Sequence, residues 1–300
     1  MEKTNDISGL VIVNKEEGIT SQGVVNRIKR IYGVSKAGHT GTLDPMATGV
    51  LPVLIGRGVK ASEFMLTSAK HYGATLLLGV TTDTEDVTGT VLSECEVTAT
   101  EDEVLAAIDR FVGEIMQTPP MYSALKVGGR KLCDLARRGE TVEREARPVT
   151  VYSIKTSRIN EREYYLDVEC SKGTYIRTLC ADIGASLGCG GTMKTLTRLS
   201  ASGYGIDGAH TLTELEAMSD EERLSLVYPV EDVFKKYELV VLADFFARLA
   251  RAGQEIYLHK IKKSFNIGDV VRLSDSDGFF AVGEVREFDE GLAIKPIRQF

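Results

Sequence analysis

The sequence predicts a mixed α/β fold whose sheet is largely antiparallel. Segments typical of strands alternate with segments typical of amphipathic helices, and several strand pairs are separated only by short turns, as in hairpins. No glycine-rich phosphate loop links a predicted strand to a helix, which argues against a dinucleotide-binding sheet. From about residue 240 onward short β-type runs predominate, and we expect a second, smaller domain there.

The first elements are a strand and a capped helix. Residues 10–14 form a β-branched run typical of a strand, and Thr20 or Ser21 provides the N-cap of a helix. The apolar face of this helix has helical spacing and consists of Val24, Val25, Ile28 and Ile31. A further helix is expected around residues 59–65. Residues 74–80 and 87–93 predict a strand pair around the acidic turn TTDTEDVTG.

The middle of the chain continues this alternation. Thr100 and Glu103 form a capping box for a helix that ends near Phe111. Residues 149–159 and 164–169 predict a hairpin, and residues 175–187 predict a helix.

The C-terminal segment has its own pattern. A helix is expected over residues 243–252, followed by three short strands at 269–273, 279–286 and 292–296. Asp277-Gly278 is a turn signal between the first two strands. The acidic, periodic segment 211–232 is expected to connect this small, mostly β module to the main domain.

Composition indicates an ordinary globular protein. Hydrophobic residues make up 43% of the chain and charged residues 26%. No stretch approaches the roughly 20 apolar residues of a membrane span, and the first residues do not resemble a secretory signal, so a cytoplasmic location is expected. The five cysteines include no CxxC pair, and the four histidines form no HxxxH or HExxH pair. No metal is therefore indicated.

Charge is segregated along the chain. The formal net charge is −7, which by itself argues against a polyanionic partner. Residues 81–114, however, hold ten acids against one base, whereas residues 20–75 hold seven bases against two acids. Residues 117–138 are basic as well. A basic surface on these segments suits a polyanionic substrate, although a solvated helix face is the simpler interpretation of residues 20–31 alone.

The segment GHTGTLDPMATGVLP, residues 38–52, carries one carboxylate in an otherwise uncharged run. Asp44 is the only formally charged side chain between His39 and Leu54, and a proline follows it directly. Asp before Pro commonly starts a turn, and that interpretation has equal weight on local grounds. An isolated acid on a tightly turned, glycine-rich backbone is also a candidate nucleophile or base.

Two other segments hold candidate site residues. Tyr72, in KHYGATLLLGV, is on local grounds a half-buried packing residue at a strand start. Arg177, in SKGTYIRTLCADIG, lies near the start of the predicted helix at 175–187. A surface arginine paired with Asp182 or with nothing would contribute about 0–1 kcal/mol. A buried carboxylate elsewhere in the fold would need such a cation to stay ionised.

Together these segments resemble the TruB-type tRNA pseudouridine(55) synthases. The resemblance covers nearly the whole chain and is strongest over residues 8–92 and 117–205. It implies a pseudouridine synthase catalytic domain over residues 1–239, with an RNA-binding insertion at about 117–148. A PUA-like RNA-binding domain over residues 240–300 would follow it.

The resemblance also implies roles for individual residues. Asp44 is the nucleophile, Tyr72 lies against the target base, and Arg177 contacts Asp44 and keeps it ionised and oriented. The residues implied in substrate and RNA binding are His39, which enters the RNA loop, Leu199 of the uracil pocket, Lys60, Asp83, and Lys126 and Arg130 of the basic loop.

Several of these residues have simpler interpretations, and two positions depart from the family pattern. His39 taken alone is more often structural, Lys60 is equally a lysine at the edge of the core, and Asp83 is equally part of an exposed turn. Cys133 stands where an aromatic residue is common, and Thr197 replaces a frequent arginine. The detailed contacts of the basic loop therefore do not follow from the resemblance.

The implied activity is isomerisation of one uridine in the T-arm loop of tRNA, with the base flipped out of its stack and no cofactor. The protein would act as a monomer without a protein partner or guide RNA. Asp44 would attack C1′, attack C6, or assist loss of a C2′ proton to give a glycal, and the sequence does not choose among these routes. The rival classes are a non-catalytic RNA-binding protein, a nucleoside hydrolase or glycosylase, and a guide-dependent relative.

Overall fold

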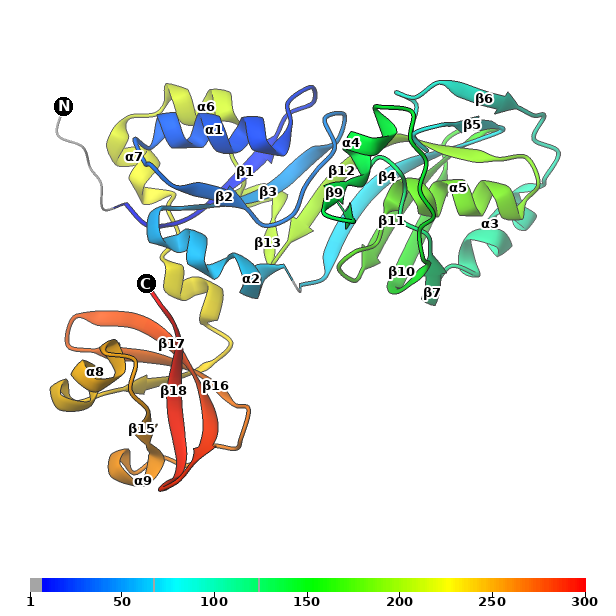
Figure 1. The fold of residues 1–300 in the computed structure, drawn as a ribbon. Helices are drawn as coiled ribbons and strands as arrows, with labels where there is room; N and C mark the ends of the chain where they lie inside the picture. The colour runs from blue at the N-terminus through cyan, green and yellow to red at the C-terminus, as the bar shows by residue number, and fades with distance from the viewer. Residues whose placement is uncertain (1–6, 67, 124) are drawn as a thin grey trace.

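A computed structural model describes residues 7–66, 68–123 and 125–300, leaving aside the side chains of Lys126 and Lys131. The chain forms an elongated main body and a smaller C-terminal body beneath one end of it (Figure 1). Within the described residues, no helix combines the length and the apolar composition required to cross a bilayer.

One nine-stranded sheet runs through the main body. Its path is β1-β3-β12-β4-β11-β10-β7, with β2 paired to β3 and β13 paired to β12. Among the described strand pairs of this nine-stranded sheet, only β3–β12 is parallel. The strand bounds are β1 Gly9–Lys15, β2 Ala37–His39, β3 Thr48–Ile55, β4 Lys70–Leu78, β7 Gly113–Gln117, β10 Arg147–Arg158, β11 Glu163–Cys170, β12 Gly191–Ala201 and β13 Tyr204–Gly205. The predicted mixed, largely antiparallel sheet is confirmed.

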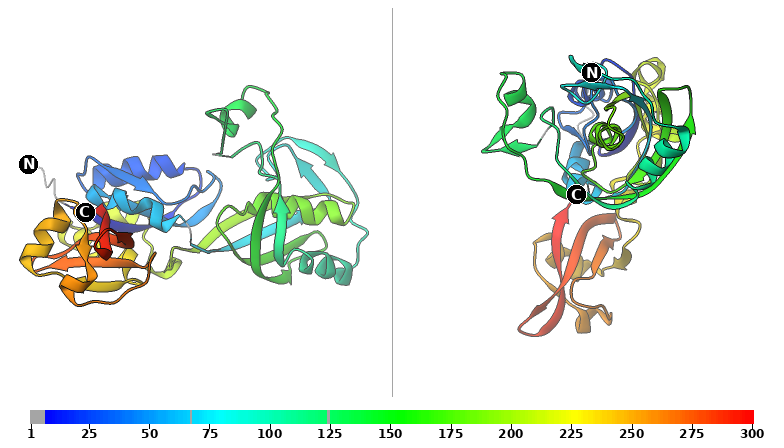
Figure 2. Two further views of the ribbon diagram at one scale, coloured as in Figure 1. Left: turned by 60° about the horizontal axis from the view of Figure 1, so that its bottom comes forward. Right: turned by 90° about the vertical axis from the view of Figure 1, so that its right-hand side faces the viewer.

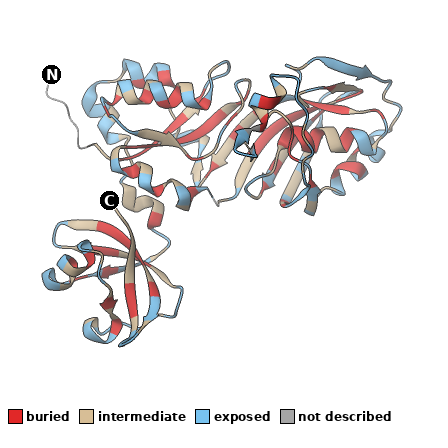
Figure 3. Ribbon diagram, in the orientation of Figure 1, coloured by how far each residue is buried: buried red, intermediate tan, exposed pale blue. Residues whose placement is uncertain are grey.

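Helices cover two parts of this sheet and define two hydrophobic cores. Near β1 and β3, α1 (Ser21–Ile31) buries Val24, Val25 and Ile28, and α6 (Leu212–Ala217) and α7 (Asp220–Ser225) lie beside it. In the other part, α3 (Glu101–Asp109) and α5 (Ile176–Ser186) pack on β10, β4 and β12. The end-on view of Figure 2 shows the sheet curving around α5. In Figure 3 the buried residues follow these strands and the helix faces that meet them.

Local signals located most of these elements correctly. Thr20 caps α1 by accepting the Gly23 N–H, and Thr100 forms the expected capping box with Glu103. The hairpin β10–β11 is confirmed. The helix expected around residues 59–65 is a 3-10 segment, Gly56–Ala61, that continues into α2 (Ser62–Met65).

The expected strand pair 74–80 with 87–93 is wrong. β4 pairs instead with β11 and β12, strands more than 80 residues away in the chain. A separate short strand, β5 (Val80–Thr82), pairs with β6 (Val91–Glu94) around the acidic turn. The positive φ of Gly79, +81°, separates β4 from β5 and lets the chain change direction there.

The basic segment and the C-terminal body form smaller sheets. β8 (Lys126–Val127) and β9 (Arg130–Lys131) make a hairpin that leads into α4 (Leu132–Ala136). The C-terminal sheet has the order β14-β16-β17-β18-β15. Its elements are β14 Glu238–Val241, α8 Asp244–Arg251, β15 Ile256–Tyr257, α9 Leu258–Ile261, β16 Val270–Asp275, β17 Gly278–Phe288 and β18 Gly291–Gln299. β14 starts two residues before the expected domain boundary, and that boundary stays a prediction.

An aromatic cluster joins the two bodies. Phe234 is fully buried, and its ring contacts those of Phe64, Tyr237, Phe279 and Phe300 at centroid distances of 5.0–6.4 Å. The same core includes residues of β1 and β3 as well as β17. β3, which directly follows the Asp44 segment, is therefore packed against the junction with the C-terminal body.

Candidate active site

The Asp44 segment is a loop between β2 and β3 that the N-terminal elements hold in place. Lys15, at the end of β1 and fully buried, donates from Nζ to the carbonyls of Pro45 and Ala47. Ser21, the first residue of α1, exchanges hydrogen bonds with the backbone of Leu43, with Leu43 N–H donating to Oγ at 2.9 Å and Oγ donating to the Leu43 carbonyl at 3.0 Å. The backbone on both sides of Asp44 is thus fixed.

Arg177 lies against this loop. Its Nε is 3.0 Å from Asp44 Oδ2, and its Nη2 is 3.5 Å from Oδ1. Nη1 donates to the Thr84 carbonyl at 2.9 Å, and Nη2 donates to the Tyr122 carbonyl at 2.7 Å. The arginine side chain is 5% exposed and the Asp44 side chain 34% exposed. Because the buried guanidinium has several partners, it holds the Asp44 carboxylate in one orientation. Part of that carboxylate remains open to solvent.

The start of α5 determines where Arg177 lies. The helix begins at Ile176 with Tyr175 as its N-cap, and Gln117 at the end of β7 fixes that cap. The Tyr175 N–H donates to Gln117 Oε1 at 2.7 Å, and Gln117 Nε2 donates to the Tyr175 carbonyl at 3.0 Å. Arg177 is the second residue of the helix, so a rigid element carries it to the loop.

A second carboxylate, Asp86, also approaches Arg177. It is 4% exposed, and its Oδ2 is 3.7 Å from Arg177 Nη1. Its Oδ1 accepts from the Thr88 N–H at 3.0 Å and from the hydroxyls of Thr84 and Thr88. Asp83, the acid of this turn that the resemblance singled out, is exposed and accepts from the Thr90 N–H at 2.7 Å. The structure therefore brings Asp86, and not Asp83, to the arginine.

These surroundings shift the ionisation of Asp44. Burial raises the pKa of Asp44 above the usual value, the guanidinium of Arg177 opposes this rise, the Asp86 carboxylate adds to it, and Lys15 opposes it. Burial also lowers the pKa of Lys15 to about 8. A carboxylate that is desolvated and yet paired with a cation is more basic than one in water and can still be ionised at neutral pH.

Tyr72 lies on β4 within the core beside this loop. It is 7% exposed and packs in the same cluster as Leu43 and Ala47. On the neighbouring strand β12, its register partner is Arg198, and Leu199 occupies a bulge next to that pair. Burial raises the pKa of Tyr72, and the nearby Arg198 opposes the rise, so the phenol is neutral at physiological pH.

Arg198 fixes the two ends of the Asp44 loop. It is 1% exposed, its Nε donates to the Val50 carbonyl at 2.7 Å, and its Nη2 donates to the Gly41 carbonyl at 3.1 Å. The parallel contact between β3 and β12 requires a glycine at position 49, where φ is +100°. A Cβ there would lie 2.3 Å from the Arg198 carbonyl oxygen.

The remaining predicted residues lie apart from the Asp44–Arg177 pair or are outside the description. His39 is half-buried at the end of β2, and its Nδ1 accepts from the Gly41 N–H at 3.4 Å. Lys60 is exposed and donates to the Gln299 carbonyl at 2.9 Å, so it faces the C-terminal body. Arg130 is exposed on β9. The side chain of Lys126 lies outside the described residues.

Sequence reasoning missed Lys15, Asp86 and Arg198. Lys15 had a weak signal, because a lysine that ends a buried β-branched strand is unusual. The turn TTDTED contains three acids, and nothing in the sequence indicates which of them contacts Arg177. Arg198 stands in LTRLS between a threonine and a leucine, a pattern that gives no sign of its burial.

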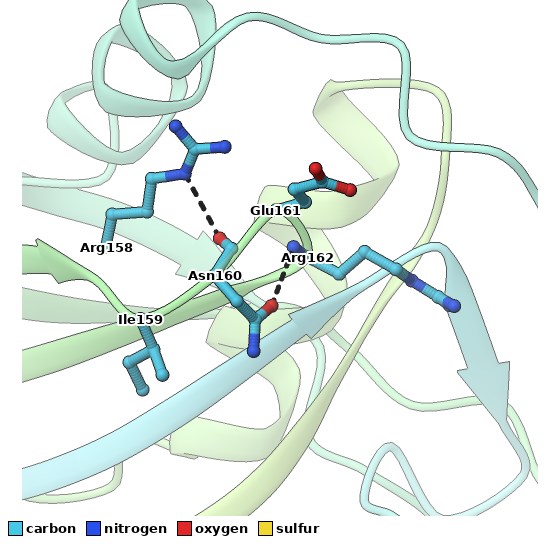
Figure 4. Close-up of a pocket in the computed structure, with 5 residues that line it drawn as sticks. All are labelled: Arg158, Ile159, Asn160, Glu161 and Arg162. Atoms are coloured by element: carbon cyan, nitrogen blue, oxygen red, sulfur yellow. Dashed lines mark hydrogen bonds between the residues drawn. The ribbon is translucent and has the colours of Figure 1, made fainter.

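We searched the described residues for grouped metal ligands and for pockets away from this site. Within the described ranges, no three His, Cys, Asp or Glu side chains are grouped as metal ligands. A shallow pocket is found elsewhere, around the β10–β11 turn, and is lined by Arg158, Ile159, Asn160, Glu161 and Arg162 (Figure 4). Both arginines are engaged there, Arg158 with Glu101 and Arg162 with the Leu78 carbonyl. Leu78 is about 20 Å along β4 from Tyr72, so this pocket is not part of the Asp44 site.

Comparison with known proteins identifies the family. Residues 29–176 match the model of the TruB family pseudouridylate synthase N-terminal domain, and residues 177–235 match that of the tRNA pseudouridylate synthase B C-terminal domain. The chain belongs to the TruB family. The resemblance inferred from its motifs is thereby confirmed.

Relatives and solved structures agree with this family. The tRNA pseudouridine synthase B of Alkaliphilus oremlandii is 41% identical, covering 94% of this chain and 95% of that protein. The Clostridium tetani protein of the same name is 40% identical, covering 93% and 96%. The solved structure of a Cbf5-Nop10-Gar1 complex has a chain with a TM-score of 0.73 and 26% identity, covering 97% of this chain and 84% of that one. This chain thus shares its fold with a chain of a Cbf5-Nop10-Gar1 complex.

Proposed function

We propose that this chain is a tRNA pseudouridine(55) synthase, an isomerase that converts the uridine at position 55 in the T-arm loop of tRNA to pseudouridine. The observation that carries the proposal is the Asp44 carboxylate, partly open to solvent and paired with buried Arg177, in a chain of the TruB family. The names of the relatives that are about 40% identical support the substrate. We propose a cytoplasmic location, which a tRNA substrate supports.

The reaction exchanges one bond of the nucleotide for another. The N1–C1′ bond breaks, the uracil turns within the site, C5 bonds to C1′, the C5 proton leaves and N1 gains a proton. The target base must first leave its stack, at a cost of a few kcal/mol that contacts with the loop offset. The reaction consumes no redox equivalent and transfers no external group, so it needs no cofactor.

Each residue of the site has a role in this proposal. Asp44 acts at C1′, at C6 or on the C2′ proton, and Arg177 holds it ionised and aimed. Tyr72 lies against the flipped base, and its neutral phenol is the nearby group for the proton steps. Asp86 positions Arg177 from the other side. His39, Leu199 and the basic hairpin with Arg130 hold the RNA.

Release of tritium tests the reaction directly. Wild-type protein incubated with a tRNA transcript that carries [5-³H]uridine should release tritium, because C5 loses its hydrogen. A hydrolase would release uracil instead, and a binding protein would release neither. Asp44→Asn keeps the shape of the side chain and should abolish tritium release. Full activity of that variant would refute the proposed site.

The same assay addresses guide dependence. We expect the purified chain to act as a monomer on bare tRNA without other proteins or RNA. This chain aligns over nearly its whole length with a chain of the Cbf5-Nop10-Gar1 complex. The fold alone therefore does not distinguish a protein that acts by itself from one that acts within an assembly. The second body, with its five-stranded sheet, is proposed to contact the tRNA outside the T-loop.

A further inference from the structure

Three basic side chains from three strands converge on Gly41. The Gly41 N–H donates to His39 Nδ1 at 3.4 Å, and the Gly41 carbonyl accepts from Arg198 Nη2 at 3.1 Å. On the side where any other residue would carry its Cβ, the nearest atoms are Arg198 Nη1 at 3.5 Å and Lys70 Cε at 3.8 Å. The φ of Gly41 is +136°, a value that favours glycine, so this arrangement depends on glycine at position 41.

Among the residues that the structure describes, the charges of Lys70 and Arg198 have no carboxylate partner within 4.0 Å. Lys70 Nζ donates to the Ser68 carbonyl, at 3.0 Å. Burial and the nearby charge of Arg198 lower the pKa of Lys70 and that of His39. Like charges held together away from water are costly, and an anion beside them would relieve the cost.

The group also lies next to the proposed reaction centre. Lys70 and Tyr72 are two residues apart on β4, so their side chains leave the same face of the sheet. Arg198 is the register partner of Tyr72, and Gly41 is three residues before Asp44. A nucleotide whose base lies on Tyr72 and whose sugar meets Asp44 has its own backbone phosphates within reach of these cations.

We propose that Lys70, His39 and Arg198 form a phosphate cradle for one of the two backbone phosphates that flank the target uridine. The inference rests on the proposed function and specifies how the target nucleotide is held. Lys70 and His39, which are partly exposed, contact the phosphate oxygens, whereas Arg198 is buried and contributes a fixed charge. Since Nδ1 of His39 accepts a hydrogen bond, the neutral ring carries its proton on Nε2 and is a donor. Such a contact secures the sugar and leaves the base free to turn.

A chemical double-mutant cycle tests the cradle. T-arm stem-loops are made with an uncharged methylphosphonate either 5′ or 3′ of the target uridine, and their binding to wild type and to Lys70→Gln is measured by fluorescence anisotropy. One of the two substitutions should weaken wild-type binding about tenfold, the loss typical of a charge-assisted hydrogen bond. Lys70→Gln should weaken binding of the unmodified stem-loop by a similar factor. The affinity of this variant should fall little further when the stem-loop carries the methylphosphonate that weakens wild-type binding.

Two further measurements sharpen the test. In Lys70→Gln one phosphate contact is lost, so the slope of the logarithm of the RNA-binding constant against the logarithm of salt concentration should become about 0.7 less steep. Lys70→Arg keeps the charge and should have nearly the wild-type slope. Lys155→Gln, at an exposed lysine of β10, should leave both the slope and the methylphosphonate effect unchanged. Fully additive losses for Lys70→Gln with both methylphosphonates would refute the cradle. Failure of the proposed function has a different signature, because wild type would then release no tritium.

Discussion

Arg177 and Asp44, which are 133 residues apart in the sequence, form an ion pair in which the arginine Nε lies 3.0 Å from Asp44 Oδ2. The arginine comes from the first turn of a helix, and the aspartate comes from a loop between two strands. The same guanidinium also donates to the carbonyls of Thr84 and Tyr122. One side chain therefore ties together the loop, the acidic turn and the segment before the basic hairpin.

Replacing Arg177 should impair the chemical step more than RNA binding. Arg177→Lys keeps the charge but cannot serve Asp44 and two carbonyls at once, and we expect the single-turnover rate of tritium release to fall about 100-fold. The single-turnover rate of Arg177→Met should fall further, because methionine carries no charge. Affinity for tRNA should change little, because the arginine is 5% exposed and faces Asp44. A variant with lost affinity and a normal single-turnover rate would contradict this role.

Asp86→Asn should lower activity, whereas Asp83→Asn should not. Asp86 is buried, orients Arg177 and organises the turn through Thr84 and Thr88, so its loss should reduce the single-turnover rate about tenfold or more. Asp83→Asn is the matched control in the same turn. It is exposed and its amide oxygen can still accept from Thr90, so activity should stay within about twofold.

The pH dependence of the reaction should report the raised pKa of Asp44. The carboxylate must be ionised to act, so single-turnover kcat/KM should fall as the pH is lowered through a pKa above the ordinary value of about 3.9. Because the Asp86 charge contributes to that rise, Asp86→Asn should move the acidic limb to lower pH. A limb that stays in place in this variant would show that Asp86 does not influence Asp44.

Gly49→Ala should be strongly destabilising. A Cβ at this position would lie 2.3 Å from the Arg198 carbonyl oxygen, in addition to the strain of a φ of +100°. We expect a loss of roughly 4 kcal/mol or more in urea unfolding. Gly113→Ala is the control, because φ there is +111° but no atom lies within 4 Å of the added Cβ. Its loss should be about 1–3 kcal/mol, from the backbone alone. Equal losses for the two variants would mean that the close approach of β3 and β12 is unimportant.

Phe234→Ala should weaken the junction between the two bodies. The ring is fully buried among four other aromatic rings, and its removal should cost about 3–5 kcal/mol. Since the cluster spans both bodies, thermal unfolding monitored by calorimetry should change from one transition to two. Phe245→Ala, at a side chain that is 58% exposed, should leave the single transition in place. Two transitions in the wild type would show that the bodies already unfold independently.

The parts of the fold that the sequence predicted are those with local causes. The helix after Thr20 and the capping box at Thr100 follow from hydrogen bonds within four residues, and the β10–β11 hairpin follows from a short turn. The partners of β4 did not follow, because pairing with β11 and β12 depends on segments that are distant in the chain.

The site divides in the same way. Asp44 stood out as an isolated acid, but its contact with Arg177 came only from the family resemblance, since no spacing rule connects them. The buried Lys15 and Arg198 act on backbone carbonyls, and such carbonyls leave no trace in the sequence. The choice of Asp86 over Asp83 depends on which carboxylate the turn buries, and this is a property of the folded turn.

The aromatic junction at Phe234 has a consequence for the size of the RNA. Because this junction packs the C-terminal sheet against β1 and β3, the span from that sheet to Asp44 is set by the protein alone. An RNA that touches both bodies must present its two contact points at that span. A stem with one base pair more or fewer would miss one of them by the rise of one base pair. The fold would thus gauge the length of a helix without reading any of its bases.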